Sequence, residues 1–320
     1  MKEDIVLAVR VQGERWFPTQ NTFSEDMSRI WGDWYCDSEV GKLHAVLMHR
    51  PGEEIEGITE GNYEEYRFRG PINPGKALNQ QERLIEIYKQ HGVEVHYVQN
   101  QRTDLPNALY LRDLMLMTPE GAIVCRPAIP ARRGEERAVA STLSSLGVPI
   151  IKTINGDGYF EGACAIWVDR ETIILGTGSR SNEAGTDQVE HELRNIGVNH
   201  IIRTQIPYGS IHLDGYMNMV DRKKMLIFPW HVTYNCAKQL MEHGIELIEA
   251  TDIDEVKQGM AMNGVAIEPG RMIMPSRNPH TKALLEESGV EVIEVDMDEI
   301  MNGWGSVHCM TAFLKRDSIS

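Results

Sequence analysis

The sequence predicts an α/β fold built from five repeated units arranged around an axis, and three observations support this. An amphipathic segment followed by glycine and then by a β-branched run recurs five times. The glycines are Gly92, Gly147, Gly197, Gly244 and Gly289, at intervals of 55, 50, 47 and 45 residues. Further apolar runs bring each unit to about three strands and one helix. Periods of about 20–50 residues are typical of propellers and solenoids. An open α/β sheet whose helices all end in glycine is the alternative.

The elements of each unit follow from hydrophobic periodicity. A glycine directly after an amphipathic segment suits the left-handed position that ends a helix. The expected helices cover residues 79–91, 135–146, 188–196, 237–243 and 282–288. Strands are expected after each glycine and in the apolar or β-branched runs 44–50, 121–126, 165–169, 172–176, 216–221, 224–228 and 270–275.

Composition and charge limit the possible partners. The chain has 320 residues, 42% hydrophobic and 25% charged, as in a globular protein with an ample core. The formal net charge is −15, which repels phosphate and argues against nucleic acid as a partner. It favours a small cation in an acidic cleft. No apolar run reaches the ~18 residues of a membrane span, so we expect no membrane partner, and the N-terminus does not resemble a signal peptide.

The cysteines predict a reducing, cytoplasmic environment. Their number is odd, their spacing is wide and no CxxC pair occurs, which argues against both a disulfide framework and a zinc ribbon. They are Cys36, Cys125, Cys164, Cys236 and Cys309.

Residues 37–320 are expected to form a single catalytic domain that contains all the repeats. Residues 1–36 precede it as an N-terminal extension. The extension is rich in aromatic side chains, including Trp16, Phe17, Trp31 and Trp34. It is therefore expected to pack on the body of the protein or to cover a cleft. The sequence is compatible with a homo-oligomer but does not define the oligomeric state.

Four segments place polar side chains near strand ends, where a core strand would not accept them. Each has an ordinary structural explanation, such as a surface ion pair, a turn or a small buried thiol. Together they are harder to dismiss, because the strand edges of a radial fold converge on its axis. The side chains are Asn107, Arg112 and Asp113 in the first segment, Glu161 in the second, His212 and Asp214 in the third, and His308 and Cys309 in the fourth.

A thiol, an imidazole and three carboxylates in one cleft favour one kind of substrate. A thiolate is a strong nucleophile, and histidine is its usual proton-transfer partner. Three carboxylates would raise the pKa of the thiol unless a cation normally lies between them. A guanidinium fits, because carboxylates can hold its outer nitrogens and leave its central carbon open to attack. The binding of such a cation would itself favour the thiolate.

These segments also resemble the guanidino-group-modifying (pentein, or α/β-propeller) superfamily, and most closely arginine deiminase. The run Asp37–Glu54 is similar to the family's first strand, which ends in His-Arg-Pro-Gly. Asp104–Asp113 is similar to its Pro-Asn-x-x-Phe-x-Arg-Asp motif, and Phe160-Glu-Gly162 to the start of Phe-Glu-Gly-Gly-Asp. Pro130-Ala-Arg-Arg133, His212-Leu-Asp214 and the segment at Cys309 complete a resemblance that covers residues 37–317. It implies a five-fold pseudosymmetric α/β propeller of ββαβ units around a central active site.

The resemblance implies roles for individual residues. The reaction that it implies requires neither a metal nor an organic cofactor. Cys309 would be the nucleophile, and His212 the general acid and base. Asp113, Glu161 and Asp214 would hold the guanidinium. Asn107, Arg132 and Arg180 would bind the α-carboxylate of the substrate. Arg133 is an alternative to Arg132 in this role. The chain departs from the family pattern in having Ala163-Cys164 in place of Gly-Asp.

The resulting hypothesis is a hydrolase of L-arginine, or of a close guanidino amino acid, that releases ammonia and gives citrulline. Attack by an amine in place of water would make the protein an amidinotransferase. A second attack on the ureido product would make it a dihydrolase that forms ornithine, and a methylated arginine is a further possible substrate. An inactive binding protein on the same scaffold is the alternative from another class. Glycine-rich runs near residues 156 and 176 do not complete a dinucleotide-binding motif.

Overall fold

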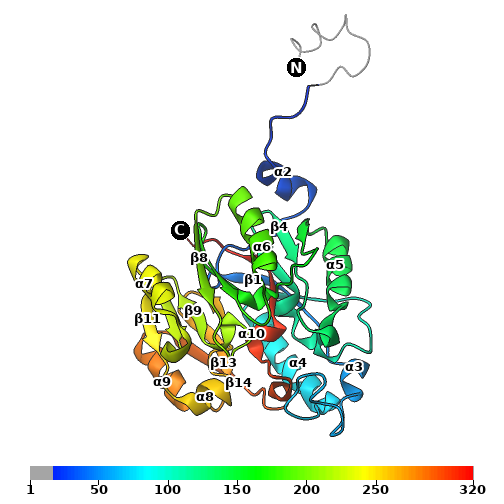
Figure 1. Ribbon diagram of the computed structural model, residues 1–320, viewed down its shortest axis with the longest axis vertical. Helices are drawn as coiled ribbons and strands as arrows, with labels where there is room; N and C mark the ends of the chain where they lie inside the picture. Colours follow the sequence, from blue (N-terminus) through cyan, green and yellow to red (C-terminus); the bar gives the residue numbers. More distant parts are fainter. Residues whose placement is uncertain (1–16, 320) are drawn as a thin grey trace, which may run out of the picture.

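Five three-stranded sheets surround a common centre (Figure 1), in a computed structural model that describes residues 17–319. In every sheet the middle strand pairs antiparallel with one neighbour and parallel with the other. The sheets are β3 (Met115–Thr118), β4 (Gly121–Val124) and β5 (Ile150–Thr153); β6 (Ala165–Asp169), β7 (Thr172–Thr177) and β8 (His200–Gln205); β9 (Met217–Asp221), β10 (Lys224–Ile227) and β11 (Glu246–Glu249); β12 (Val265–Glu268), β13 (Arg271–Pro275) and β14 (Glu291–Val295); and β15 (Ala312–Arg316), β1 (Leu43–Met48) and β2 (Glu94–Tyr97).

A helix links the middle strand of each sheet to the parallel strand, as a crossover connection requires. These helices are α4 (Pro74–Gln90), α5 (Glu135–Leu146), α6 (Glu183–Asn195), α7 (Tyr234–Glu242) and α9 (Pro279–Glu287). The shorter helices are α2 (Phe23–Ile30), α3 (Glu53–Glu56), α8 (Ile253–Lys257) and α10 (Val307–Met310). The predicted five-fold arrangement of ββαβ units is therefore confirmed.

The glycine that follows each crossover helix has the predicted left-handed conformation. The five φ angles lie between 76° and 92°, a region that side chains with a Cβ rarely adopt. They belong to Gly92, Gly147, Gly197, Gly244 and Gly289. The repeat seen in the sequence is thus a repeated helix ending, after which the chain turns back into the sheet.

The two ends of the domain close the ring. The C-terminal strand β15 pairs antiparallel with β1, so that Leu47 lies opposite Ala312. In Figure 1 the red end of the chain accordingly lies beside the blue start of the domain. One sheet is thus completed by residues more than two hundred positions apart, which ties the ring together without a linker.

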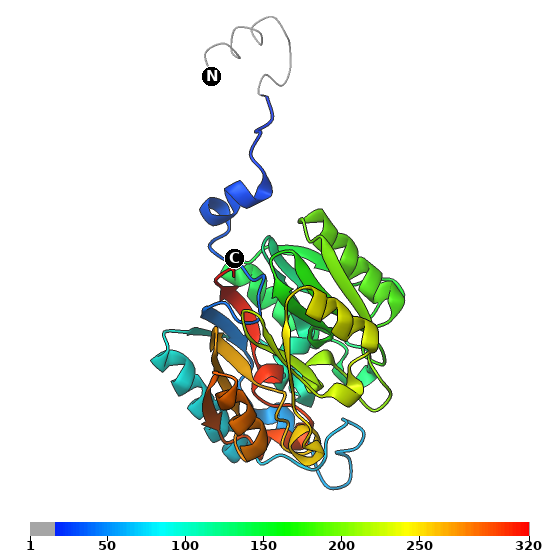
Figure 2. The same ribbon diagram turned by 90° about the vertical axis from the view of Figure 1, so that its left-hand side faces the viewer.

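The end of the N-terminal extension packs on the body: Trp34 lies against the hydrophobic core, Cys36 is buried, and the backbone N–H of Tyr35 donates to the backbone oxygen of Leu314 at 3.2 Å. Helix α2 begins with a capping box between Thr22 and Glu25 and buries Met27. The hydroxyl of Ser24 donates to the carboxylate of Glu120 at 2.7 Å. Phe17 and Trp31 are largely exposed, and Figure 2 shows α2 standing off one end of the domain. The extension was expected to pack on the body; residues 1–16, including Trp16, lie outside the described residues.

Two further findings concern membrane-spanning helices and the cysteines. Among residues 17–319 no helix is both long and apolar enough to cross a bilayer. All five cysteines are buried free thiols.

Candidate active site

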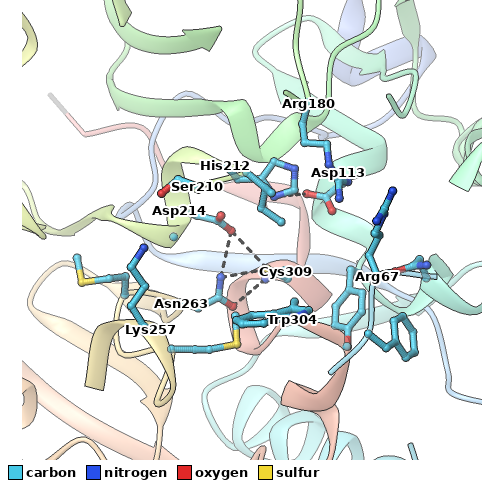
Figure 3. A pocket seen from close by; sticks show the side chains of 18 of the residues that line it. Arg67, Asp113, Arg180, Ser210, His212, Asp214, Lys257, Asn263, Trp304 and Cys309 are labelled. Carbon is cyan, nitrogen blue, oxygen red and sulfur yellow. Dashed lines mark hydrogen bonds and ion pairs between the residues drawn. The ribbon is translucent and has the colours of Figure 1, made fainter. Parts of the chain in front are cut away.

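A cavity of about 550 Å³ lies where the five units meet, and polar side chains from several of them converge on it (Figure 3). Seven of the eight predicted site residues line this cavity, namely Asn107, Asp113, Arg132, Arg180, His212, Asp214 and Cys309. The eighth, Glu161, is fully buried behind His212. The structure therefore brings the predicted set together from separate parts of the chain.

Each unit supplies its site residue from the short segment that precedes its first strand. The 3-10 turn Leu111–Leu114 carries Asp113 ahead of β3, and Leu213–Gly215 carries Asp214 ahead of β9. Glu161 directly precedes the turn Gly162–Cys164 ahead of β6. Cys309 lies in α10 ahead of β15. Tight turns of this kind place one side chain at the centre before the chain turns outward into its sheet.

The surroundings of Cys309 favour the neutral thiol over the thiolate. Its sulfur donates to Oδ2 of Asp214 at 3.6 Å and accepts from Nδ2 of Asn263 at 3.0 Å. Burial, together with the negative charges of Asp214 and Asp113, raises the pKa of the thiol well above its usual value. A positive charge between these two carboxylates would reverse the second effect.

His212 is held between two carboxylates. Its Nε2 lies 2.6 Å from Oε2 of Glu161, and its Nδ1 lies 3.6 Å from Oδ1 of Asp113. Burial favours the neutral ring, but the charges of Asp113 and Glu161 outweigh burial and raise the pKa of His212. The same contact, helped by Arg180, lowers the pKa of the buried Glu161 to about 2. An imidazolium next to an ionised carboxylate can donate a proton to a leaving group.

Asp214 is fixed by a buried chain of charged groups. Nδ1 of His308 lies 2.8 Å from Oδ2 of Asp214, and Nε2 of His308 lies 3.3 Å from Oε2 of Glu39. Arg112 in turn donates to Glu39 at 2.7 Å. Burial alone would lower the pKa of His308, but hydrogen bonds to both carboxylates raise it. The same contact with His308 lowers the pKa of Asp214, which favours its ionised form.

Arg132 and Glu161 make contacts that differ from the sequence-based expectation. Arg132 is 3% exposed, and its guanidinium pairs with Asp113, with Glu135 and with the backbone oxygen of Tyr110. Its donors thus orient Asp113 in this structure and do not point to an open subsite. Glu161 contacts His212 and Arg180, so it orients the imidazole and lies out of reach of a substrate in the cavity.

The remaining expected residues lie as follows. Arg180 reaches the cavity wall while it donates to both oxygens of Glu161 at 3.0 and 3.2 Å. Nδ2 of Asn107 donates to the backbone oxygen of Tyr66 at 3.0 Å. Cys164 is fully buried and does not line the cavity, and burial raises the pKa of its thiol well above the usual value. Cys164 therefore fills space behind the site.

Sequence reasoning missed three groups at the site. Asn263 contacts the sulfur, Glu39 orients His308, and Arg67, an exposed residue, lines the cavity. Asn263 lies two residues before β12, in the place that acidic or thiol side chains occupy in the other units. Its position in the repeat was the signal that could have identified it.

Asp113, Glu161 and His212 offer ligand atoms within 4.8 Å of one another, a spacing that a metal ion could use. Arg132 and Arg180 already neutralise the two carboxylates, and the histidine lies between them. This donor set fits an ion-pair network around an imidazolium better than a metal centre.

A five-fold α/β ring with a thiol, an imidazole and paired acids at its centre is the arrangement of the guanidino-group-modifying superfamily, and comparison with known proteins confirms that assignment. The family profile described as "N,N dimethylarginine dimethylhydrolase, eukaryotic" matches residues 66–316. The chain belongs to this family.

Related proteins carry several activities in their names. The chain is 26% identical to the uncharacterized protein YkgA of Bacillus subtilis, covering 88% of this chain and 95% of that one. It is 23% identical to N(G),N(G)-dimethylarginine dimethylaminohydrolase of Streptomyces coelicolor (84% and 96% covered). It is 20% identical to arginine deiminase of Rhodococcus erythropolis (88% and 97% covered).

Solved structures agree in fold. The amidinotransferase SxtG from Microseira wollei superposes with a TM-score of 0.75 at 17% identity, covering 89% of this chain and 98% of that one. The citrulline complex of the dimethylarginine dimethylaminohydrolase from Pseudomonas aeruginosa superposes with a TM-score of 0.69 at 22% identity, covering 85% and 100%.

The contact between His212 and Glu161 predicts a pH effect. Glu161→Gln removes a negative charge that raises the pKa of His212, so this pKa should fall by about one unit. If the imidazolium is the acid, the alkaline limb of kcat moves to lower pH by the same amount. Carbon-13 NMR of labelled histidine and a pH profile of turnover measure the two effects. Glu192→Gln on α6 is the control, and an unshifted His212 pKa in Glu161→Gln would contradict the assignment.

Proposed function

We propose that the protein hydrolyses the terminal guanidinium of L-arginine, or of a close guanidino amino acid, to citrulline and ammonia. The observation that carries this proposal is the position of two carboxylates, Asp113 and Asp214, around the thiol of Cys309. In Figure 3 these carboxylates lie to either side of His212, with Cys309 below them. Both lie in the wall of one cavity. A planar cation with N–H donors on both outer nitrogens would satisfy both acids at once.

The charges define the order of steps. A guanidinium bound between Asp113 and Asp214 offsets the charges that raise the thiol pKa, and the thiol loses its proton to solvent. The Cys309 thiolate attacks the guanidinium carbon and forms a carbon–sulfur bond. His212 gives its proton to one terminal nitrogen, which leaves as ammonia. Neutral His212 then takes a proton from water as the water oxygen attacks the same carbon. The carbon–sulfur bond breaks, the second water proton passes to the departing sulfur, and citrulline is released with the thiol restored.

The far end of the substrate is proposed to carry a negative charge. The cavity wall includes four cationic side chains, Arg67, Arg132, Arg180 and Lys257. Arg67 is an exposed residue, and its backbone has a φ of 66°, an unusual conformation for a residue with a side chain. We propose that Arg180 and Asn107 contact the α-carboxylate. Arg132 would act on the substrate through Asp113.

A methylated arginine is the second candidate, because the matching family is described as a dimethylarginine hydrolase. Hydrolysis would then give citrulline and dimethylamine by the same steps. A dimethylated nitrogen has no N–H to donate, however, so one of the two flanking carboxylates would lose its hydrogen bond. An unpaired buried carboxylate is costly, and this favours the unsubstituted guanidinium.

Product analysis tests the proposal directly. L-arginine and N(G),N(G)-dimethylarginine are incubated with the protein, and ammonia, dimethylamine, citrulline and ornithine are quantified. We expect citrulline and ammonia in equal amounts from arginine, and slower turnover of the dimethylated substrate. Cys309→Ser should abolish turnover while the circular dichroism spectrum stays unchanged. Ornithine as the product would indicate a dihydrolase. Turnover that occurs only when an amine is added would indicate an amidinotransferase. No turnover of any guanidino compound would favour an inactive binding protein.

Arg180→Ala tests the carboxylate subsite. A charge-assisted hydrogen bond contributes about 1.5–3 kcal/mol, so kcat/KM for L-arginine should fall roughly ten- to a hundredfold. Agmatine, which has no carboxylate, should be affected much less. Arg133→Ala is the matched control, because that neighbouring arginine does not line the cavity. Equal losses for both substrates would mean that Arg180 acts only through Glu161.

A further inference from the structure

We infer that Asn263 is a catalytic residue whose side-chain amide donates to the Cys309 sulfur and stabilises its thiolate. This inference rests on the part of the proposed function in which Cys309 is the nucleophile. Asn263 is 2% exposed and lines the same cavity. Its Nδ2 lies 3.0 Å from the sulfur and 3.2 Å from Oδ2 of Asp214. Figure 3 shows it beneath Asp214 and next to the thiol.

The orientation of the amide is determined by its surroundings. Oδ1 of Asn263 accepts from the backbone N–H of His308 at 3.1 Å and of Cys309 at 3.2 Å. Because a backbone N–H can only donate, the oxygen must face α10 and the NH₂ group must face the sulfur and the carboxylate. The amide therefore presents one proton to Asp214 and one to Cys309.

The backbone around Asn263 is held in place from the neighbouring unit. Nδ2 of the buried Asn218 donates to the backbone oxygens of Met262 at 2.9 Å and of Gly264 at 2.7 Å, on either side of Asn263. The adjoining Gly264 packs so closely that a Cβ there would lie 2.6 Å from the backbone oxygen of Ile273. A donor fixed in this way needs little reorganisation when charge develops on the sulfur.

The strengths of these contacts differ between the neutral thiol and the thiolate. In the neutral state the thiol donates to Asp214 and accepts from Asn263. When the thiol proton is lost, the bond to Asp214 becomes a repulsion between two negative charges. The N–H of Asn263 then becomes a charge-assisted donor to sulfur, and such bonds are roughly twice as strong as neutral ones. Asn263 thus opposes the effect of Asp214 on the thiol.

The position in the fold supports a role at the centre. Four units supply Asp113, Glu161, Asp214 and Cys309 from the segment before their first strand. Asn263 occupies that place in the remaining unit, two residues ahead of β12. It is a neutral donor where its counterparts are acids or the thiol. An acid there would add another negative charge beside the sulfur.

The test measures the thiol and does not depend on turnover. The rate of alkylation of Cys309 by iodoacetamide is followed by mass spectrometry across pH, with the thiol proton passing to solvent and iodide leaving. Asn263→Ala should raise the apparent thiol pKa by about one unit, the value of one charge-assisted hydrogen bond. Asn263→Asp keeps the oxygen that accepts from α10 but replaces the donor with a negative charge, so the pKa should rise further.

Asn182→Asp is the matched control. Oδ1 of Asn182 also accepts from two backbone N–H groups, those of Tyr159 and Gly185, at the start of a helix. The same change there adds the same charge to the same kind of cap, away from the cavity wall, and should leave the thiol pKa unchanged. An unchanged pKa in folded Asn263→Ala and Asn263→Asp would overturn the inference.

Two outcomes remain to be separated. Asn263 also caps α10, so its variants could unfold. In that case nitrogen-15 NMR of the wild-type protein gives the answer. The side-chain NH₂ signal of Asn263 should shift as Cys309 ionises and should not shift in Cys309→Ser; a signal without this titration would contradict the inference. A protein that lacks turnover of every guanidino compound but shows these thiol effects would refute the proposed substrate and not the role of Asn263.

Discussion

The balance of charge around one buried sulfur is the constraint on which the rest of this structure depends. Asp113 and Asp214 raise the pKa of the Cys309 thiol, and burial adds to their effect. A thiol in this setting is a poor nucleophile until a cation reaches the two acids. Arg132 pairs with Asp113 and His308 pairs with Asp214, but the two acids still raise the pKa of the Cys309 thiol with these partners in place. The space between the acids is therefore suited to a cationic ligand.

The five-fold fold supplies this balance because each unit contributes one short segment to the centre. The strands, crossover helices and helix-ending glycines repeat and carry stability. The residue ahead of each first strand differs from unit to unit and carries chemistry. Asp113, Glu161, Asp214, Asn263 and Cys309 occupy these positions. Related enzymes with the same ring could therefore differ in reaction through a few side chains.

Local patterns in the sequence were enough to predict the repeat, since a helix, its terminal glycine and the following strand are close in the chain. The expected helix over residues 135–146 matches α5 at both ends. Long-range pairing was not readable: that β15 completes the sheet of β1 depends on contacts between the two ends of the domain. Strands β3, β12 and β15 were not among the predicted strands.

The site was predictable where charge or a reactive group marked it. Asp113, His212, Asp214 and Cys309 stand out as polar residues at strand ends. Asn263 did not, because its segment carries no charged side chain near it and an asparagine before a glycine reads as a turn. The partners of Arg132 and the place of Glu161 behind His212 depend on three-dimensional neighbours, so motif matching could identify the residues but not their contacts.

The ionisation of Cys309 with and without a bound cation tests the central claim most directly. The ultraviolet absorbance of the thiolate is recorded across pH as the difference between the wild-type protein and Cys309→Ser. The titration is done first without ligand and then with both proteins saturated with methylguanidinium. If the two acids hold the thiol neutral and a guanidinium offsets them, the apparent pKa of Cys309 falls when the ligand binds. A pKa that stays the same or rises in the complex would contradict the account.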